Sequence, residues 1–228
     1  MGRYYALFTF LFLLTACGGG GGNSESPAPV DEPVTQIGRK VIFYGDSLTS
    51  GYHLGRPEAY PAVVQQRIDA EQLPFTVVNA GQTAETTGDG WNRLKTQDLS
   101  DTALFFLALG ANDGLRQINP ETTRVHLQAI IDEVRSRCGG CVIVMSGMRP
   151  IFPKPTSFEE AFVKIFPEVA AANGLPFYPF LLDGIFRDDR YFISDGIHPT
   201  PEGQRIMGNR VADFLLPILR EYSNSSGS

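Results

Sequence analysis

The chain has 228 residues, of which 43% are hydrophobic and 19% are charged, and its formal net charge at pH 7 is −6. A chain of this length can bury one sizeable core, and its ordinary apolar content excludes a disordered chain and a multi-span membrane protein. The acidic balance gives no indication of a nucleic-acid-binding surface.

Residues 1–16 have the pattern of an export signal. The apolar run 4–14 is too short to span a bilayer and has the length of a signal-peptide core. It leads into LTAC at 14–17, which resembles the bacterial lipobox, where the signal is cut before the cysteine and the thiol is lipidated. This resemblance implies a lipoprotein attached to the membrane through Cys17, and Gly18 implies the periplasmic face of an outer membrane. The alternative is a plain secretory signal with an incidental cysteine.

Residues 17–37 are predicted to form a flexible tether. The segment contains five consecutive glycines and then serine, proline and asparagine, and nothing in it can build a core. Such a tether would hold a folded domain close to a membrane without burying it. The folded domain is expected over 38–222, followed by a disordered tail over 223–228.

The middle of the chain alternates between apolar runs and amphipathic segments. Strands are predicted at 40–44, 75–78, 102–109, 142–145 and 176–180. Helices are predicted at 57–71, near 91–95, from 119 onward, from 157 to 174 and from 201 to about 220. Ser157 and Glu160 form a capping-box pattern that predicts where the fourth helix begins. The alternation predicts an α/β fold with a parallel sheet.

Cys138 and Cys141 form a Cys-Gly-Gly-Cys pair. In an exported protein a local disulfide is one interpretation. A redox motif or half of a metal site is an alternative, although no second Cys or His pair stands at zinc spacing. A two-residue loop between linked cysteines is tight, so free thiols also stay open.

A serine follows the first predicted strand directly, in the sequence GDSLT at 45–49. Ligands of α/β proteins bind outside the carboxyl ends of parallel strands, so Ser47 stands where chemistry is expected. Gly45 is expected to adopt a backbone conformation that other residues resist and to turn the hydroxyl toward the cleft. Taken alone, Ser47 is more simply interpreted as a turn or cap residue.

The sequence DGIHP at 195–199 supplies a carboxylate and an imidazole three residues apart. Ser47 as nucleophile, His198 as general base and Asp195 as orienting carboxylate are the three parts of a nucleophilic hydrolase. Without the serine, Asp195 and His198 are equally well explained as an Asx turn that leads into the last helix.

The other two histidines have weaker patterns. His126 lies in the middle of a predicted helix and is expected to be a surface or packing residue. His53 lies close to Ser47 in sequence and could contact substrate. A loop residue without catalytic duty is the preferred interpretation of His53, because a functional group needs a specific partner.

Three groups that follow strands are candidate donors to an oxyanion. They are the backbone N–H groups of Ser47 and Gly81 and the side-chain amide of Asn112. One such donor is typically worth about a hundredfold to a thousandfold in rate. A glycine at position 81 would let a tetrahedral centre approach the backbone closely.

Four segments of the chain resemble the signature segments of the SGNH hydrolases, also called GDSL esterases and lipases. They are GDSL at 45–48, NAG at 79–81, GAND at 110–113 and DGIHP at 195–199. Further segments are similar to the subgroup of small bacterial arylesterases, acyl-CoA thioesterases and lysophospholipases, at 114–116, 147–149, 158–167 and 201–205. The resemblance extends over about residues 40–219.

This resemblance implies a flavodoxin-like three-layer α/β/α sandwich with a five-stranded parallel sheet of order 2-1-3-4-5. It implies that Ser47, Asp195 and His198 form the catalytic triad and that Ser47, Gly81 and Asn112 form the oxyanion hole. It also implies that the reaction uses no metal and no cofactor.

Two segments depart from the subgroup. The loop after Gly147-Met148 usually carries an Asn-Tyr-Gly-like segment and here contains PIFPKP at 150–155, and the segment 91–102 is short. Both regions border the acyl site in relatives, so the preference for acyl-chain length is not carried over. The apolar side chains of Ile151 and Phe152 are hypothesised to form a wall for an acyl or aryl group.

The expected function is that of a serine esterase which hydrolyses carboxylic esters or thioesters through an acyl-Ser47 intermediate. Aryl esters, other single-chain esters and lysophospholipids are the expected substrates, and a monomer is the expected state. A carbohydrate O-deacetylase is the alternative within the same fold. A non-catalytic envelope lipoprotein that serves as a binding module is the alternative from a different class.

Overall fold

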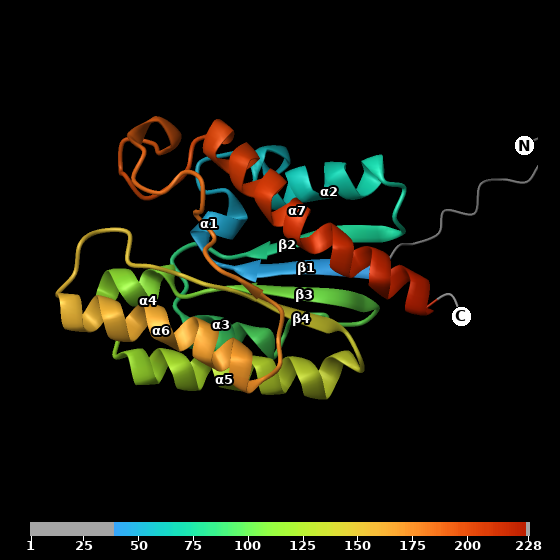
Figure 1. The fold of residues 1–228 in the computed structure, drawn as a ribbon, viewed down its shortest axis with the longest axis horizontal. Helices are drawn as coiled ribbons and strands as arrows, with labels where there is room; N and C mark the ends of the chain where they lie inside the picture. Colours follow the sequence, from blue (N-terminus) through green and yellow to red (C-terminus); the bar gives the residue numbers. More distant parts are fainter. Residues whose placement is uncertain (1–38, 227–228) are drawn as a thin grey trace, which may run out of the picture. The chain divides into compact units, whose positions relative to one another are not determined.

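The computed structural model describes residues 39–226, which form a sheet of five parallel strands covered on both faces by helices (Figure 1). The strands are β1 (Arg39–Gly45), β2 (Phe75–Gly81), β3 (Thr102–Ala108), β4 (Val142–Ser146) and β5 (Phe177–Tyr178). Their order across the sheet is β2-β1-β3-β4-β5, and every neighbouring pair is parallel. The predicted fold class and strand order are confirmed.

Seven α-helices and two short 3₁₀ helices accompany the sheet within the described residues. They are α1 (Ser47–Ser50), α2 (Tyr60–Ala70), α3 (Thr87–Leu94), α4 (Ala111–Arg116), α5 (Pro120–Cys138), α6 (Thr156–Ala172) and α7 (Pro201–Ser226), with η1 (Arg56–Glu58) and η2 (Asp189–Tyr191). Helices α2 and α7 cover one face of the sheet, and α3, α5 and α6 cover the other (Figure 1). Among the described helices, none combines the length and the apolar character that a bilayer span requires.

The two central strands carry the core. Every residue of β3 is buried, and the last five residues of β1 are buried as well. The rings of Phe43 and Phe106 lie 5.2 Å apart on neighbouring strands, and Phe43 also meets Tyr60 of α2 edge-on at 5.4 Å. Strands that are apolar on both faces need helices on both faces, which is why the chain alternates between the two.

Several helix boundaries differ from the sequence prediction: α2 begins at Tyr60 rather than at 57, α3 begins at Thr87 rather than near 91, and α6 and α7 differ as well. Helix α6 begins at Thr156 after Pro155, and no side chain caps its first turn, so the capping box predicted at Ser157 is wrong. Proline at the N-cap removes the N–H that a capping glutamate would bind. Helix α7 continues to Ser226 rather than ending near residue 220, so residues 223–226 do not belong to a disordered tail.

Aromatic packing accounts for the longer last helix. The ring of Tyr222 on α7 packs against Phe75 at the start of β2, with ring centroids 6.1 Å apart. The guanidinium of Arg39 lies 4.9 Å from the same ring, within the range of a cation–π contact. These contacts lie beyond the predicted end of the helix, and they connect strands that are distant from α7 in sequence.

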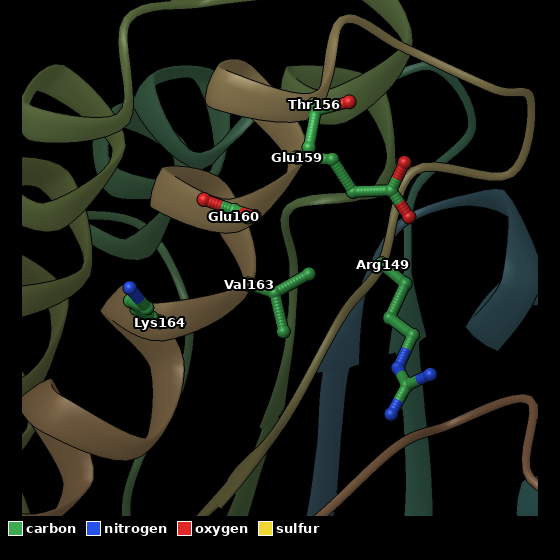
Figure 2. A pocket seen from close by; sticks show the side chains of 6 residues that line it. All are labelled: Arg149, Thr156, Glu159, Glu160, Val163 and Lys164. Atoms are coloured by element: carbon green, nitrogen blue, oxygen red, sulfur yellow. The ribbon is translucent and has the colours of Figure 1, made fainter.

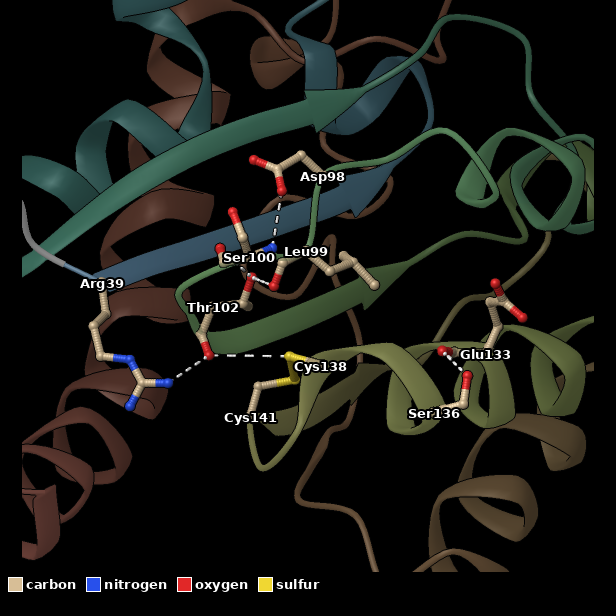
Figure 3. Close-up of a disulfide and its surroundings, with 9 residues drawn as sticks. All are labelled: Arg39, Asp98, Leu99, Ser100, Thr102, Glu133, Ser136, Cys138 and Cys141. Carbon is tan, nitrogen blue, oxygen red and sulfur yellow. Dashed lines mark hydrogen bonds between the residues drawn. A yellow bond between two sulfur atoms is a disulfide. The ribbon is translucent and has the colours of Figure 1, made fainter.

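Cys138 and Cys141 form a disulfide that links the end of α5 to the start of β4 (Figure 3). The sequence left a local disulfide, a redox motif, half of a metal site and free thiols open, and the structure contains the local disulfide. The bridge lies beside Thr102, at the amino ends of the strands, whereas ligands of such sheets bind at the carboxyl ends. The disulfide therefore closes a local turn, far from the edge at which Ser47 stands.

The predicted signal peptide 1–16, the tether 17–37 and the lipidated Cys17 lie outside the described residues. They remain predictions from the sequence.

Candidate active site

Ser47 lies at the edge of the sheet where three strands end together. Gly45 of β1 pairs with Gly81 of β2 and with Ala108 of β3, so these strands finish level with one another. Ser47 is the first residue of α1 and is only 6% exposed. N–H groups in the first turn of a helix have no partner inside it. Ser47 therefore offers a hydroxyl and a backbone N–H at the same edge.

Close packing, rather than an unusual backbone angle, explains the glycine before the motif serine. Gly45 is not among the residues with positive φ. A Cβ atom at this position would lie 2.1 Å from Thr49 Oγ1 and 2.8 Å from the carbonyl oxygen of Ala108. The predicted conformational role of Gly45 is thus replaced by a steric one, because α1 folds back directly over the strand end.

The loop between η2 and α7 places the histidine. Asp195 Oδ1 accepts the backbone N–H groups of Ile197 at 2.8 Å and His198 at 3.0 Å, an Asx turn in the loop. The N–H of Ile193 donates to the carbonyl oxygen of His198 at 2.9 Å and closes the loop on itself. The Asx turn that the sequence offered as an alternative is therefore present, and it serves to hold the two side chains.

The three predicted triad residues form a continuous hydrogen-bonded chain. His198 Nδ1 lies 2.6 Å from Asp195 Oδ2, and His198 Nε2 lies 2.9 Å from Ser47 Oγ. Because a carboxylate only accepts, the ring proton sits on Nδ1, and Nε2 is left to accept the proton of Ser47. This is the geometry that a nucleophile, a general base and an orienting carboxylate require.

Hydrogen bonds keep Asp195 in its charged form. Burial by itself would raise the pKa of this carboxyl group. The hydrogen bonds from the His198 ring and from the N–H groups of His198 and Ile197 outweigh that effect and hold the pKa below its ordinary value. A charged Asp195 stabilises the imidazolium that forms when His198 takes a proton.

Tyr52 covers one face of the His198 ring, with ring centroids 4.4 Å apart. Its backbone N–H donates to the carbonyl oxygen of Ser47, so Tyr52 is held by the same short helix as the nucleophile. His53 lies on Tyr52 at 3.9 Å, is exposed and does not line the cavity beside Ser47. It is thus placed as the loop residue that the sequence favoured.

His126 lies away from the triad on α5. Its Nδ1 is 3.3 Å from the hydroxyl of Thr87, and its ring stacks on Trp91 at 5.9 Å. These contacts join α5 to α3, which agrees with the predicted packing role.

A cavity of about 240 Å³ opens beside the triad. Ser47, His198 and Asn112 supply polar groups to its lining. Its apolar lining consists mainly of aliphatic side chains, from Leu48, Leu115, Ile151 and Ile197. An ester with its carbonyl at Ser47 could place an apolar group against this wall.

One of the two predicted wall residues lies in the lining of this cavity. Ile151 is 7% exposed and lines it. Phe152 is 41% exposed and does not line it, so the hypothesis that Phe152 forms part of the wall is wrong. Its ring lies close to Gly196, 3.8 Å from where a Cβ atom would be, over the loop that carries the triad histidine. The two neighbouring side chains lie differently in this loop, and the sequence did not show which one turns inward.

Asn112 and Gly81, the two predicted oxyanion donors outside Ser47, have different outcomes. Asn112 Nδ2 donates to the carbonyl oxygen of Glu85 at 2.9 Å, and the second N–H of the amide is available because Asn112 lines the cavity. The N–H of Gly81 donates to Asn79 Oδ1 at 3.0 Å, and Gly81 does not line the cavity. A Cβ atom at Gly81 would lie 2.3 Å from the backbone nitrogen of Ser50. Gly81 is therefore a packing glycine, and its predicted role is corrected.

Ala84 occupies the place that was predicted for Gly81. It lines the cavity with Ser47 and Asn112, and its φ of 65° lies in the left-handed region. L-residues adopt this conformation at a cost of about 1–2 kcal/mol. The candidate donors are thus the N–H groups of Ser47 and Ala84 and the amide of Asn112. A search for glycine could not find Ala84, because its backbone conformation is not marked by its residue type.

Asp46 is fully buried beneath the nucleophile. Its Oδ1 accepts the N–H of Leu48 at 3.0 Å, which caps α1. Burial raises the pKa of Asp46 to about 7, against the opposing effect of the Leu48 N–H and with a smaller contribution from nearby Asp113. Asp46 is therefore a capping residue that carries less than a full negative charge near neutral pH.

A larger hollow of about 410 Å³ lies between α6 and the segment that carries Arg149 (Figure 2). Its lining is mostly charged and contains no serine, cysteine or histidine: Arg149, Thr156, Glu159, Glu160, Val163 and Lys164. The smaller cavity is thus the one with nucleophilic chemistry. Within residues 39–226, no group of three or more His, Cys, Asp or Glu side chains is placed to hold a metal ion.

Known proteins resemble this chain in sequence and in fold. The family model for the GDSL-like Lipase/Acylhydrolase family matches residues 43–206. An arylesterase of Vibrio mimicus is 28% identical over 186 residues, which are 81% of this chain and 92% of that protein. Thioesterase 1/protease 1/lysophospholipase L1 of Escherichia coli (strain K12) is 28% identical over 184 residues, which are 80% of this chain and 86% of that protein.

A solved structure shares the fold. The psychrotrophic esterase EstA from Pseudoalteromonas sp. superposes with a TM-score of 0.74 at 21% sequence identity, covering 80% of this chain and 99% of that one.

Replacing Ala84 by glycine tests the left-handed backbone at the cavity. Glycine adopts positive φ without the Cβ penalty but makes the unfolded chain more flexible, so Ala84→Gly is expected to stabilise the fold by up to about 1 kcal/mol. Ala70 is exposed at the end of α2, and Ala70→Gly is expected to destabilise, by at most the roughly 1 kcal/mol that glycine costs in a helix interior. Urea denaturation of both variants measures the difference, and equal destabilisation would contradict a left-handed Ala84.

The buried carboxyl of Asp46 predicts a stability that depends on pH. Between about pH 4, where an unfolded aspartate ionises, and about pH 7, the folded state holds the extra proton. Stability therefore falls as pH rises through this window and stays level above it. Asp46→Asn keeps an oxygen for the Leu48 N–H and removes the ionisation. Urea titrations at several pH values measure the free energy of unfolding of wild type and of Asp46→Asn. The wild-type value minus the variant value should decline as pH rises from about 4 to about 7. A difference that does not change with pH would show that Asp46 ionises normally.

Proposed function

The chain belongs to the GDSL-like lipase/acylhydrolase family and is a serine ester hydrolase; from its geometry we propose that Ser47 is the nucleophile, His198 the general base and Asp195 the orienting carboxylate. The observation that carries these roles is the unbroken chain from Ser47 Oγ through both ring nitrogens of His198 to Asp195, beside a cavity with an apolar wall.

The reaction begins when a substrate carbonyl carbon lies against Ser47 Oγ. His198 Nε2 accepts the hydroxyl proton as the new C–O bond forms, and the carbonyl oxygen becomes an oxyanion. The N–H groups of Ser47 and Ala84 and the amide of Asn112 donate to that oxygen. When the tetrahedral intermediate collapses, His198 gives its proton to the departing alcohol or thiol, and an acyl-Ser47 ester remains.

Water completes the cycle by the same steps in reverse roles. His198 removes a proton from a water molecule as its oxygen attacks the acyl carbon. The second oxyanion meets the same donors, and Ser47 Oγ leaves and recovers its proton from His198. Asp195 stays charged throughout, because its hydrogen bonds favour the ionised form.

Small single-chain esters and thioesters are the substrates that the cavity favours. Its volume of about 240 Å³ lies below the roughly 300–1,000 Å³ that is common for ligand sites, so one short acyl or aryl group can be enclosed. The names of the relatives, an arylesterase and a thioesterase/lysophospholipase, suggest aryl esters, acyl thioesters and lysophospholipids.

The enzyme's location is a separate part of the proposal. The sequence pattern at 14–17 and the glycine-rich tether after it support an exported lipoprotein held through Cys17 at the periplasmic face of an outer membrane. A lipid anchor on a flexible tether would keep the domain near membrane lipids while its cavity stays in water.

The first test is hydrolysis of p-nitrophenyl esters of graded acyl length. We expect turnover by the domain 38–228, the highest kcat/KM for short chains, and a loss in Ser47→Ala of at least about a thousandfold in kcat. Ser136→Ala makes the same chemical change at an exposed position on α5 and should keep full activity. Turnover that survives in Ser47→Ala would refute the serine mechanism. No turnover of any ester by wild type would direct attention to acetylated sugars, and then to a binding role.

Lipidation can be tested on the full chain by incorporation of a labelled fatty acid in a bacterial host. Wild type is expected to take up label, and Cys17→Ala is expected to take up none, because the thiol is the acylated atom. The double variant Cys138→Ala, Cys141→Ala retains Cys17 and should be labelled like wild type. Equal labelling with and without Cys17 would show that another group is acylated, and no labelling of wild type would indicate a plain secretory signal; either result contradicts lipidation at Cys17.

A further inference from the structure

Arg93 of α3 lies directly behind the candidate oxyanion donors and makes three contacts there. Its Nε donates to Glu85 Oε1 at 2.7 Å, and its Nη2 lies 3.4 Å from the carbonyl oxygen of Gly45. Its guanidinium carbon lies 4.0 Å from the centre of the Tyr44 ring. The pair is largely buried, with 22% of the Arg93 side chain and 11% of the Glu85 side chain exposed.

These contacts touch the chain close to two of the candidate donors and reach the third through one further hydrogen bond. Gly45 is two residues before Ser47. Glu85 directly follows Ala84, and the Glu85 carbonyl oxygen accepts the hydrogen bond from Asn112. One ion pair is therefore connected to the end of β1, to the left-handed turn at Ala84 and, through a single hydrogen bond, to the amide on α4.

We propose that Arg93, through its ion pair with Glu85, is a positioning residue that fixes the three oxyanion donors of the ester hydrolase relative to one another. The inference rests on the proposed function, because it assigns a role within that same site. It adds a residue that touches neither the nucleophile nor the cavity.

Preorganisation is the physical reason for such a role. Donors accelerate acyl transfer only if they already point to where the charge develops, since turning them during the reaction costs the energy they would supply. Ala84 adopts a left-handed conformation that an L-residue otherwise avoids, so its turn must be held by its surroundings. Two guanidinium groups act on this turn: Arg116 Nη2 donates to the carbonyl oxygen of Ala84 at 2.8 Å, and Arg93 holds the carboxylate of the next residue, Glu85.

The planar guanidinium suits this position better than an ammonium would. It donates in two directions at once, toward Glu85 and toward the Gly45 carbonyl, while its face lies on Tyr44. Tyr44 is itself fixed, since its hydroxyl donates to the carbonyl oxygen of Gly90 in α3 at 2.7 Å. A buried ion pair is weak evidence for a contribution to stability, so a role in geometry is the better explanation for its place.

The experiment combines Arg93→Met with Asn112→Ala. Methionine keeps an apolar side chain against Tyr44 and removes the guanidinium N–H groups that bind Glu85 and Gly45. We expect Arg93→Met to lower kcat by about tenfold to a hundredfold with KM changed less than about threefold, because the donors act mainly in the transition state. Asn112→Ala removes one of the three oxyanion donors. Adding Arg93→Met to it should lower kcat by less than Arg93→Met does in wild type, because only the N–H groups of Ser47 and Ala84 are then left to be misplaced.

Arg220→Met is the matched control. Arg220 makes a two-pronged ion pair with Glu71 at the far end of α7, at 2.6 and 2.7 Å, and its loss should leave kcat unchanged. Arg93→Lys keeps the positive charge but cannot donate toward Glu85 and Gly45 with the fixed geometry of a guanidinium. If Arg93→Met does not fold, Arg93→Lys is combined with Asn112→Ala in its place. We expect Arg93→Lys to recover only part of the rate.

Two results would overturn the inference. One is an unchanged kcat in the Arg93 variants. The other is a kcat loss that multiplies in full with that of Asn112→Ala, which would show that Arg93 does not position Asn112 together with the other two donors. Failure of the proposed function gives a different result, since wild type itself would then hydrolyse no ester, or Ser47→Ala would remain active.

Discussion

The site depends on how closely helix α1 approaches the ends of the two strands beneath it. Gly45 and Gly81 pair with each other at the ends of β1 and β2, and neither has room for a Cβ atom because Thr49 and Ser50 of α1 lie against them. This close approach, to the Thr49 side chain at Gly45 and to the α1 backbone at Gly81, goes with a sharp turn of the chain after β1 that leaves Ser47 at the first position of a helix. The hydroxyl, the N–H at the helix start and the level strand ends all follow from that single constraint.

The arrangement of Ser47, His198 and Asp195 and the fold class could be predicted because side-chain chemistry and periodicity encode them. Asp195 and His198 are three residues apart, and the Asx turn at Asp195 that fixes the imidazole is a local property of that segment. Likewise, a run that is apolar on both faces specifies a central strand such as β3. In both cases the residue types themselves carry the information.

Backbone conformation and the facing of loop residues could not be predicted in the same way. Gly81 has the right residue type for a donor, but its N–H is occupied by Asn79, while Ala84 has the conformation without the glycine. Ile151 and Phe152 are equally apolar, and only the course of the loop decides that Ile151 lines the cavity. Both outcomes depend on contacts between segments that are distant in sequence. Such contacts cannot be predicted from the residue types of a single sequence.

The carboxyl groups near the oxyanion donors are partly neutralised or paired, at an edge of the sheet where the proposed reaction creates an anion. Three carboxyl groups lie beneath the donors, and unscreened negative charge there would oppose the oxyanion. Burial raises the pKa of Asp46 to about 7, which reduces its charge. Asp113 accepts hydrogen bonds from the N–H and hydroxyl of Thr87 and from Thr123, and Glu85 is paired with Arg93. Each acid thus also holds a segment that carries a donor, and the same contacts that fix the donors limit the repulsion that the acids would cause.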